Sequence, residues 1–262
     1  MTLRNLKILA ALVRHSAIEE MEFRTNAVAN MITTLVGLIL ALYFLDAMFA
    51  EVGSLGGWNI YQVLALFGVA LTLEGLLEMW LFPSLHALSE KVRTGDLDCL
   101  LLRPVDCQFS VSFSKVNIWE LPRAIIGVAV VVYSMHAQGT LGGSNLLVFA
   151  GLLMGGVAIF YSLFLITCTL SIWFVKIGDI WIVSYTIMEV GRFPVSAFPQ
   201  SVRVLLTFFV PIYFISNVPV DGAMGMASQA SVVGATLACL ISLCISRMFW
   251  VFALRSYESA SS

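Results

Sequence analysis

Two acidic residues inside a long apolar stretch, Glu74 and Glu78, form the most informative polar pair in the sequence. They are four residues apart, so on a helix they share one face. A charged side chain inside a bilayer is costly, and it usually faces a bundle interior or water. The functional interpretation of the pair is the polar lining of a cavity or a conformational latch. A structural pair with a neighbouring helix or with Arg residues is the alternative.

Enzyme signatures are missing from the sequence. It has no H-E-x-x-H and no G-x-S-x-G motif, and without a Gly-Lys dipeptide it has no Walker A phosphate loop. The three histidines are far apart, and no Cys/His cluster has the spacing of metal ligands. We therefore expect no catalytic, cofactor-binding or metal-binding residue in this chain.

The elements that must position the two glutamates are membrane helices. Of the 262 residues, 60% are hydrophobic and 11% are charged, whereas a soluble domain has about 25% charged residues. The apolar runs predict an all-α membrane protein with six transmembrane helices in a single domain, residues 1–262. The expected spans are 27–50, 58–82, 121–137, 146–175, 202–218 and 231–254.

Two further segments are expected to be helical without crossing the membrane. Residues 1–26 combine an apolar stripe with basic side chains, which predicts an N-terminal amphipathic helix lying in the membrane interface. Residues 177–199 contain three charges and two prolines, and they predict an interfacial helix followed by a turn, with a partial span as the alternative.

The basic residues predict the orientation. The connections at 51–57, 138–145 and 217–229 contain no Lys or Arg. We assign all 14 Lys and Arg residues to the connections and helix ends on the opposite side of the membrane. By the positive-inside rule, both termini and the loop at 83–118 are then cytoplasmic.

Proline and glycine interrupt the chain before the last span. Pro211, Pro219 and Gly222 accompany Asp221 in a stretch that otherwise remains apolar. Irregular backbone at membrane depth requires protein or water around it. Residues 217–230 therefore predict a re-entrant segment on the outer side, with a simply kinked loop as the alternative.

The loop at 83–118 contains the sequence EKVRTGDLDCLLLRPVD, residues 90–106. Its leucines would form an apolar face that is unusual in a solvated loop, and its charges would form a polar rim. The alternative is that the leucines pack on lipid or on the protein's own helices. The expected docking residues are Arg93, Gly95, Leu97, Asp98, Leu100, Leu101, Arg103 and Pro104.

Two stretches carry a family resemblance. Residues 91–104, KVRTGDLDCLLLRP, and residues 191–220 resemble the ABC-2 type transporter permease superfamily. Within it they are similar to a bacterial branch of exporter permeases whose genes often occur in pairs. The order of predicted elements, from the N-terminal amphipathic helix to the outer re-entrant segment, fits the same superfamily.

The resemblance implies a permease subunit of an ATP-driven exporter in the bacterial inner membrane. It implies that the cytoplasmic loop couples to two ABC ATP-binding subunits, which would hold ATP and Mg. It also implies a second permease chain, identical or paralogous, with lipid around both. No nucleic-acid partner is expected. The alternatives are a secondary transporter and a non-transporting membrane scaffold or assembly subunit.

Overall fold

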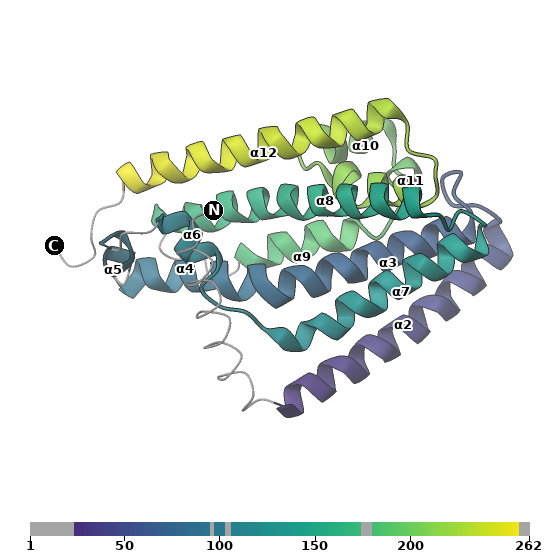
Figure 1. The fold of residues 1–262 in the computed structure, drawn as a ribbon, viewed down its shortest axis with the longest axis horizontal. Helices are drawn as coiled ribbons and strands as arrows, with labels where there is room; N and C mark the ends of the chain where they lie inside the picture. Colours follow the sequence, from purple (N-terminus) through teal and green to yellow (C-terminus); the bar gives the residue numbers. More distant parts are fainter. Residues whose placement is uncertain (1–23, 95–96, 103–105, 174–179, 257–262) are drawn as a thin grey trace.

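The computed structural model of the protein describes residues 24–94, 97–102, 106–173 and 180–256. Within these ranges the chain forms an elongated helical bundle, whose long helices follow one axis (Figure 1). One end carries α5 (Leu97–Leu101), α6 (Cys107–Ser112) and the last turn of α12 (Gln229–Arg255), and we call it the α5 end. The opposite end carries α10 (Gln200–Phe208) and is called the α10 end.

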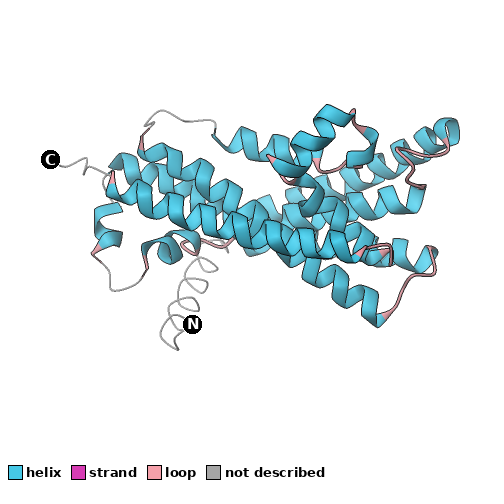
Figure 2. Cartoon of the chain, turned by 90° about the horizontal axis from the view of Figure 1, so that it is seen from above, coloured by secondary structure: helices cyan, strands magenta, loops and turns pink. Residues whose placement is uncertain are grey.

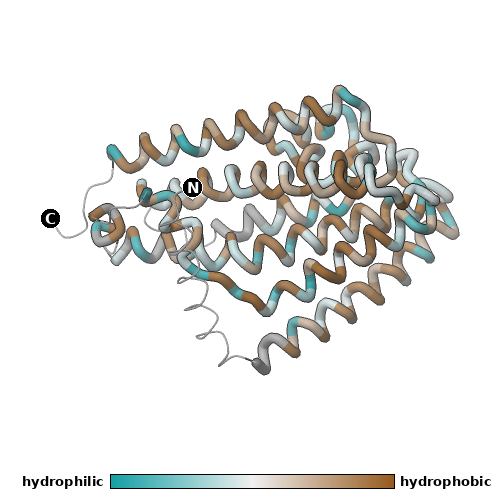
Figure 3. Tube along the Cα trace, in the orientation of Figure 1, coloured by the Kyte–Doolittle hydropathy of each residue, from teal (hydrophilic) through white to brown (hydrophobic). Residues whose placement is uncertain are grey.

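Five described helices are long and apolar enough to cross a membrane. They correspond to five of the predicted spans, and they confirm the prediction of an all-α membrane protein. Figure 3 shows hydrophobic residues along much of α2 and α12. The five comprise α2 (Arg24–Val52), the helix Ile60–Leu88, η3 (Ile118–Glu120) with α7 (Leu121–Ala137), α8 (Gly143–Thr169) with η4 (Leu170–Ile172), and α12.

The second of these helices is longer than the predicted span. It begins at α3 (Ile60–Leu76), where Asn59 and Gln62 form a reciprocal capping box. It passes through a π-helical turn, η2 (Leu77–Leu81), and continues without a break as α4 (Phe82–Thr94). The loop expected over 83–118 therefore starts as a direct extension of the membrane helix.

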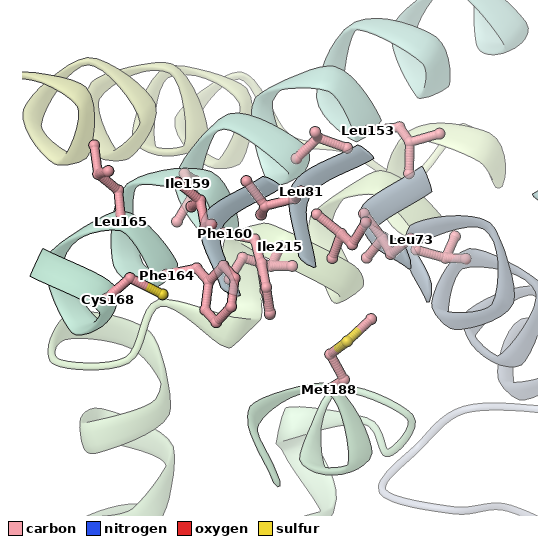
Figure 4. Packing of buried hydrophobic residues seen from close by; sticks show 14 of the residues in the cluster. Leu73, Leu81, Leu153, Ile159, Phe160, Phe164, Leu165, Cys168, Met188 and Ile215 are labelled. Atoms are coloured by element: carbon pink, nitrogen blue, oxygen red, sulfur yellow. The ribbon is translucent and has the colours of Figure 1, made fainter. Parts of the chain in front are cut away.

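α9 (Ile180–Val190) favours the partial span over the interfacial helix for residues 177–199. Instead of lying along an interface, it runs beside α3 and α8 in the bundle (Figure 1). Met188 is buried, and in Figure 4 it points from α9 toward the apolar cluster that includes Phe160 and Ile215. Further along, the Ser196 hydroxyl donates to the Gly56 carbonyl, which lies at the α10 end. The segment thus passes through the bundle. Its first residues, 177–179, lie outside the described part.

The fifth predicted span, 202–218, is not straight. α10 and the pair η6 (Tyr213–Asn217) and α11 (Val218–Ala223) bend by 74° relative to each other, with Pro211 in the break. Figures 1 and 2 place both halves toward the α10 end, so the chain turns back there. The bend thus precedes residues 217–230, for which a re-entrant segment is predicted, and the pair has the form of either a broken span or a re-entrant segment.

One basic residue departs from the predicted one-sided distribution. Arg203 Nη2 donates to the carbonyls of Ser196 and Phe198. Because Ser196 contacts Gly56 in the connection between α2 and α3, Arg203 lies at the α10 end. The prediction is wrong for this residue, because its guanidinium binds loop carbonyls there.

Small residues set the close packing of α3 against α7. A Cβ added at Gly127 would clash with Thr72, and one added at Gly75 would clash with Ala124. Such contacts let two backbones approach closely in a membrane. The contact at Ala124 also fixes the neighbouring Arg123 beside the face of α3 that bears the two glutamates.

The N-terminal amphipathic helix predicted over 1–26 lies outside the described residues as far as position 23. Residues 24–26 already belong to α2. The partition of residues 1–262 into a single permease domain with these subsegments remains a prediction.

Candidate functional site

The two glutamates lie where α3 changes into the π-helical turn. Glu74 occupies the last turn of α3 and is only 7% exposed, and Glu78 lies in η2. π-Helical turns are rare and often occur at functional sites. Both carboxylates have Arg partners from other helices, so each charge is compensated within the bundle.

Glu74 pairs with Arg192, which follows α9. Arg192 donates to Glu74 Oε1 from Nη2 at 2.5 Å and from Nε at 3.1 Å. Its Nη1 lies 3.1 Å from the carboxylate of Glu189, one turn earlier in the chain. The guanidinium also lies 6.0 Å from the ring centroid of Phe67, within the range of a cation–π contact. Arg192 thus links the end of α9 to α3.

Glu78 pairs with Arg123 from the first turn of α7. Arg123 Nη1 donates to Glu78 Oε2 at 2.7 Å, and the Tyr185 hydroxyl donates to Glu78 Oε1 at 2.9 Å. Arg123 also lies 3.5 Å from Glu120, whose other oxygen accepts from Asn30 of α2 at 2.9 Å. This network connects η2, α7 and α9 through the Glu78 carboxylate, and it reaches η3 and α2 through the Glu120 carboxylate.

These groups border a cavity of about 400 Å³. It lies over one face of α3, with α2 on one side and α9 on the other. Its polar lining consists of charged groups together with the hydroxyls of Thr33, Thr34 and Tyr185. The remaining lining residues are Gly37, Leu38, Ala41, Phe67, Leu71 and Met188.

The structure fits both sequence-based interpretations of Glu74 and Glu78, the lining of a cavity and a structural ion pair. Both residues are ion-paired, as the structural alternative required, and both line a cavity. Their partners Arg123 and Arg192 could not be identified from the sequence. Arg123 follows Pro122 at a helix start, and Arg192 belongs to the segment expected at the interface.

The α5 end contains the residues expected to dock a partner. Leu97 is fully buried and Leu100 is 8% exposed, and both belong to the main apolar cluster of the chain. Their placement corrects the expectation that they offer an outward face, because they pack beneath the loop. Leu102, by contrast, is 86% exposed.

Other predicted docking residues cannot be placed. Gly95, Arg103 and Pro104 lie outside the described residues, as do the side chains of Arg93 and Leu101. Asp98 is half-buried in the first turn of α5. A coupling role for this set stays a prediction.

The α5 end is anchored to the membrane helices by side-chain contacts. Trp80 Nε1 donates to the Ser112 carbonyl at 2.6 Å, and its ring stacks on Phe113 with centroids 4.9 Å apart. The Ser84 hydroxyl donates to the Lys115 carbonyl at 2.7 Å. Residues 106–115 are therefore held against the helix that bears the glutamates.

A second anchor joins this end to α12. Arg247 donates to both carboxylate oxygens of Asp106, at 2.6 and 3.2 Å, and to Gln108 Oε1 at 2.7 Å. Asp106 also caps α6 by accepting from the Phe109 backbone N–H. The hydrogen bond from Arg247 holds the pKa of Asp106 below its ordinary value. The contact therefore persists at neutral pH.

The outer residues singled out in the sequence cluster in the bent pair. Pro219 is buried in α11, and Asp221 lies half-buried in the same helix. Gly222 allows α11 to approach α8, because an added Cβ would lie 2.8 Å from Leu152. Pro211 marks the break before η6. Of these residues only Pro211 lies in the break, and a transport role for all four remains a prediction.

The chain was compared with known proteins. A family model described as ABC-2 family transporter protein matches residues 35–261. No curated protein matches the chain at a significant level. The family match confirms the resemblance seen in residues 91–104 and 191–220. It spans far more than half of the chain and includes the α5 end, the bent pair and all of the cavity lining except Thr33 and Thr34. The chain therefore belongs to the ABC-2 transporter family, which consists of membrane permeases of ABC-type transporters.

Proposed function

We propose that the chain is the permease subunit of an ATP-driven exporter of the bacterial inner membrane. One observation supports this most strongly. A single continuous helix, Ile60 to Thr94, joins the charged cavity to the packed α5 end. A partner that moves the α5 end would thereby act directly on the cavity.

Two ABC ATP-binding subunits are the proposed partners, and they hold ATP and Mg. Leu102 is the described apolar side chain that is available to one of them. The buried Leu97 and Leu100 support the loop from below. Exposed apolar residues with a polar rim are typical of protein–protein interfaces.

A second permease chain is proposed to complete the translocation pathway. α2 exposes large apolar side chains over most of its circumference, including Val28, Ile32, Ile39 and Tyr43. Lipid or a neighbouring permease would cover them equally well, and the present sequence fits an identical or a paralogous partner.

For the topology we propose six crossings, with both termini cytoplasmic. α9 together with the segment that reaches Ser196 is the fifth crossing, and residues 200–223 form the re-entrant element on the outer side. The α5 end carries Lys91, Arg247 and Arg255 and is assigned to the cytoplasm.

Co-expression tests the proposal. The chain is purified from membranes together with the products of neighbouring genes, and the purified complex is assayed for ATP hydrolysis and for ATP-dependent transport in vesicles. We expect an ATPase to co-purify and the chain alone to bind no nucleotide. Nucleotide binding by the isolated chain would contradict the proposal.

A further inference from the structure

The lining of the charged cavity between α2 and α9 changes from apolar to charged along the bundle axis. α3 runs from the α10 end toward the α5 end, so Phe67 and Leu71 precede Glu74 and Glu78 along this axis. The charged residues therefore gather toward the α5 end, and the apolar lining lies farther toward the middle of the bundle.

α2 runs antiparallel to α3, and its lining residues show the same division between a polar and an apolar part. It starts toward the α5 end, where Thr33 and Thr34 line the charged part of the cavity. Gly37, Leu38 and Ala41 follow and line the apolar part. Two antiparallel helices thus present the same division, with a polar part toward the α5 end and an apolar part beyond it.

The dimensions correspond to one leaflet of a bilayer. Phe67 and Glu78 are eleven residues apart, which corresponds to about 16 Å along a helix. The hydrocarbon core of a bilayer is about 30 Å thick. The cavity volume of about 400 Å³ is within the range of about 300–1,000 Å³ typical of small-molecule sites.

The charges at the polar part have both signs. Glu74, Glu78 and Glu189 contribute carboxylates, and Arg123 and Arg192 contribute guanidinium groups. Among the described residues, Arg123 Nη2 and the second carboxylate oxygen of Glu74 make no hydrogen bond. One donor and one acceptor of opposite charge are thus free to bind a ligand that carries both charges.

From these observations we propose that the cavity binds the head group of a zwitterionic amphipath, with its chain directed along Phe67 and Leu71. The substrate reaches the site sideways from the cytoplasmic leaflet, between α2 and α9. The proposal rests on the proposed function for its orientation, since it takes the α5 end as cytoplasmic. An amphipath in that leaflet has its head on the cytoplasmic side and its chain toward the bilayer centre, which is the order of the lining.

Photo-cross-linking of the full-length protein tests this proposal. The protein is placed in phosphatidylglycerol nanodiscs, where no other zwitterion is present, and exposed to a dodecylphosphocholine analogue that carries a diazirine in its chain. We expect cross-links in residues 33–41 and 67–78. Unlabelled dodecylphosphocholine should compete about tenfold better than dodecyltrimethylammonium or dodecyl sulfate, because each of these satisfies only one charge.

Matched tryptophan variants of α2 locate the binding. Gly37 has open space where a side chain would begin, so Gly37→Trp fills the cavity without changing its charge. Leu40 is 62% exposed and does not line the cavity, so Leu40→Trp is the control. Ala41→Trp is a second filling variant, and melting curves confirm that each protein is folded. We expect both filling variants to lose most of the cross-linking and the control to keep it.

Two results would overturn the inference. One is cross-linking that persists in folded Gly37→Trp and Ala41→Trp. The other is equal competition by the cationic, anionic and zwitterionic amphipaths. Retention of the ATPase is measured on the same preparations. A protein that holds its ATPase but shows no cavity cross-link contradicts only this inference. Cross-linking in a protein that binds no ATPase contradicts only the proposed function.

Discussion

Leu97 and Leu102 lie five residues apart in the same loop, and truncating them should affect different properties. Leu97→Ala should lower the stability of the chain, and Leu102→Ala should weaken binding of the ATP-binding subunit. Leu97 is fully buried in the apolar cluster, whereas Leu102 is 86% exposed. Leu97→Ala removes buried methyl groups and leaves a cavity, which costs about 2–5 kcal/mol of stability. Leu102→Ala removes nothing that the folded chain uses, so the stability of the chain should stay within about 0.5 kcal/mol.

For binding of the ATP-binding subunit, Leu102→Ala should have the larger effect and Leu97→Ala the smaller. If Leu102 becomes buried in the interface, its contact contributes about 1.5–3 kcal/mol. Leu102→Ala should then weaken binding by about ten- to 150-fold. Leu97→Ala should leave binding nearly unchanged in the fraction that remains folded, because its side chain does not reach the surface.

A pull-down and a melting curve on one preparation decide the matter. The permease variants are purified, part of each sample is heated, and the rest is titrated onto immobilised ATPase. The reasoning would be refuted if Leu97→Ala lost the ATPase while melting like the wild type. Unchanged ATPase binding by Leu102→Ala would remove this residue from the interface.

Three further predictions concern other parts of the molecule. Glu74→Gln should lower stability by about 1–3 kcal/mol, because the half-buried Arg192 loses its charge-assisted hydrogen bonds to Glu74 and keeps only the Glu189 carboxylate. Adding Arg192→Gln should restore melting without restoring transport; transport that returns with stability would make the pair purely structural. Gly127→Ala should destabilise the chain by about 1–3 kcal/mol through overpacking against α3, whereas Gly151→Ala, with open space at its Cβ, should not change the melting temperature. Asp106→Asn should reduce ATPase-coupled transport. Because the pKa of Asp106 is lowered, its contribution to stability should be constant above the ordinary carboxyl pKa of about 4 and lost as the pH falls further; pH-dependent melting of both proteins measures this, and a difference between them that changes between pH 6 and 8 would contradict it.

Hydropathy was sufficient to predict the long helices, because length and apolar composition alone determine what can cross a bilayer. It failed for α9, which has only eleven residues and is followed by a Gly-Arg pair and prolines. Charge near a span suggested an interface. The structure shows instead that Arg192 is tolerated within the bundle because Glu74 lies opposite it. The sequence contained both residues but no indication that they meet, since they are 118 positions apart.

For the docking motif, the sequence could not predict which leucines are buried and which are exposed. Its leucines are unusual in a solvated loop, and docking on a partner and packing on the protein's own helices would both account for them. Sequence could not separate Leu97 from Leu102, because both are leucines in one short run. Only the fold of α5 against α4 decides which is covered. The close contact of α3 with α7 was likewise unpredicted, because Gly75 and Gly127 carry no periodic signal that links two helices.

The uninterrupted helix from Ile60 to Thr94 has a consequence for how this permease can vary. Glu78 and Thr94 are sixteen residues apart, or about 24 Å along the helix axis. With no flexible joint between them, the rotational phase of the α5 end relative to the cavity is fixed by residue count. One inserted residue would turn the α5 end by about 100° and move it by about 1.5 Å. Length changes between these two points should therefore be tolerated only in near-whole turns, whereas substitutions on the exposed face of the same stretch remain free.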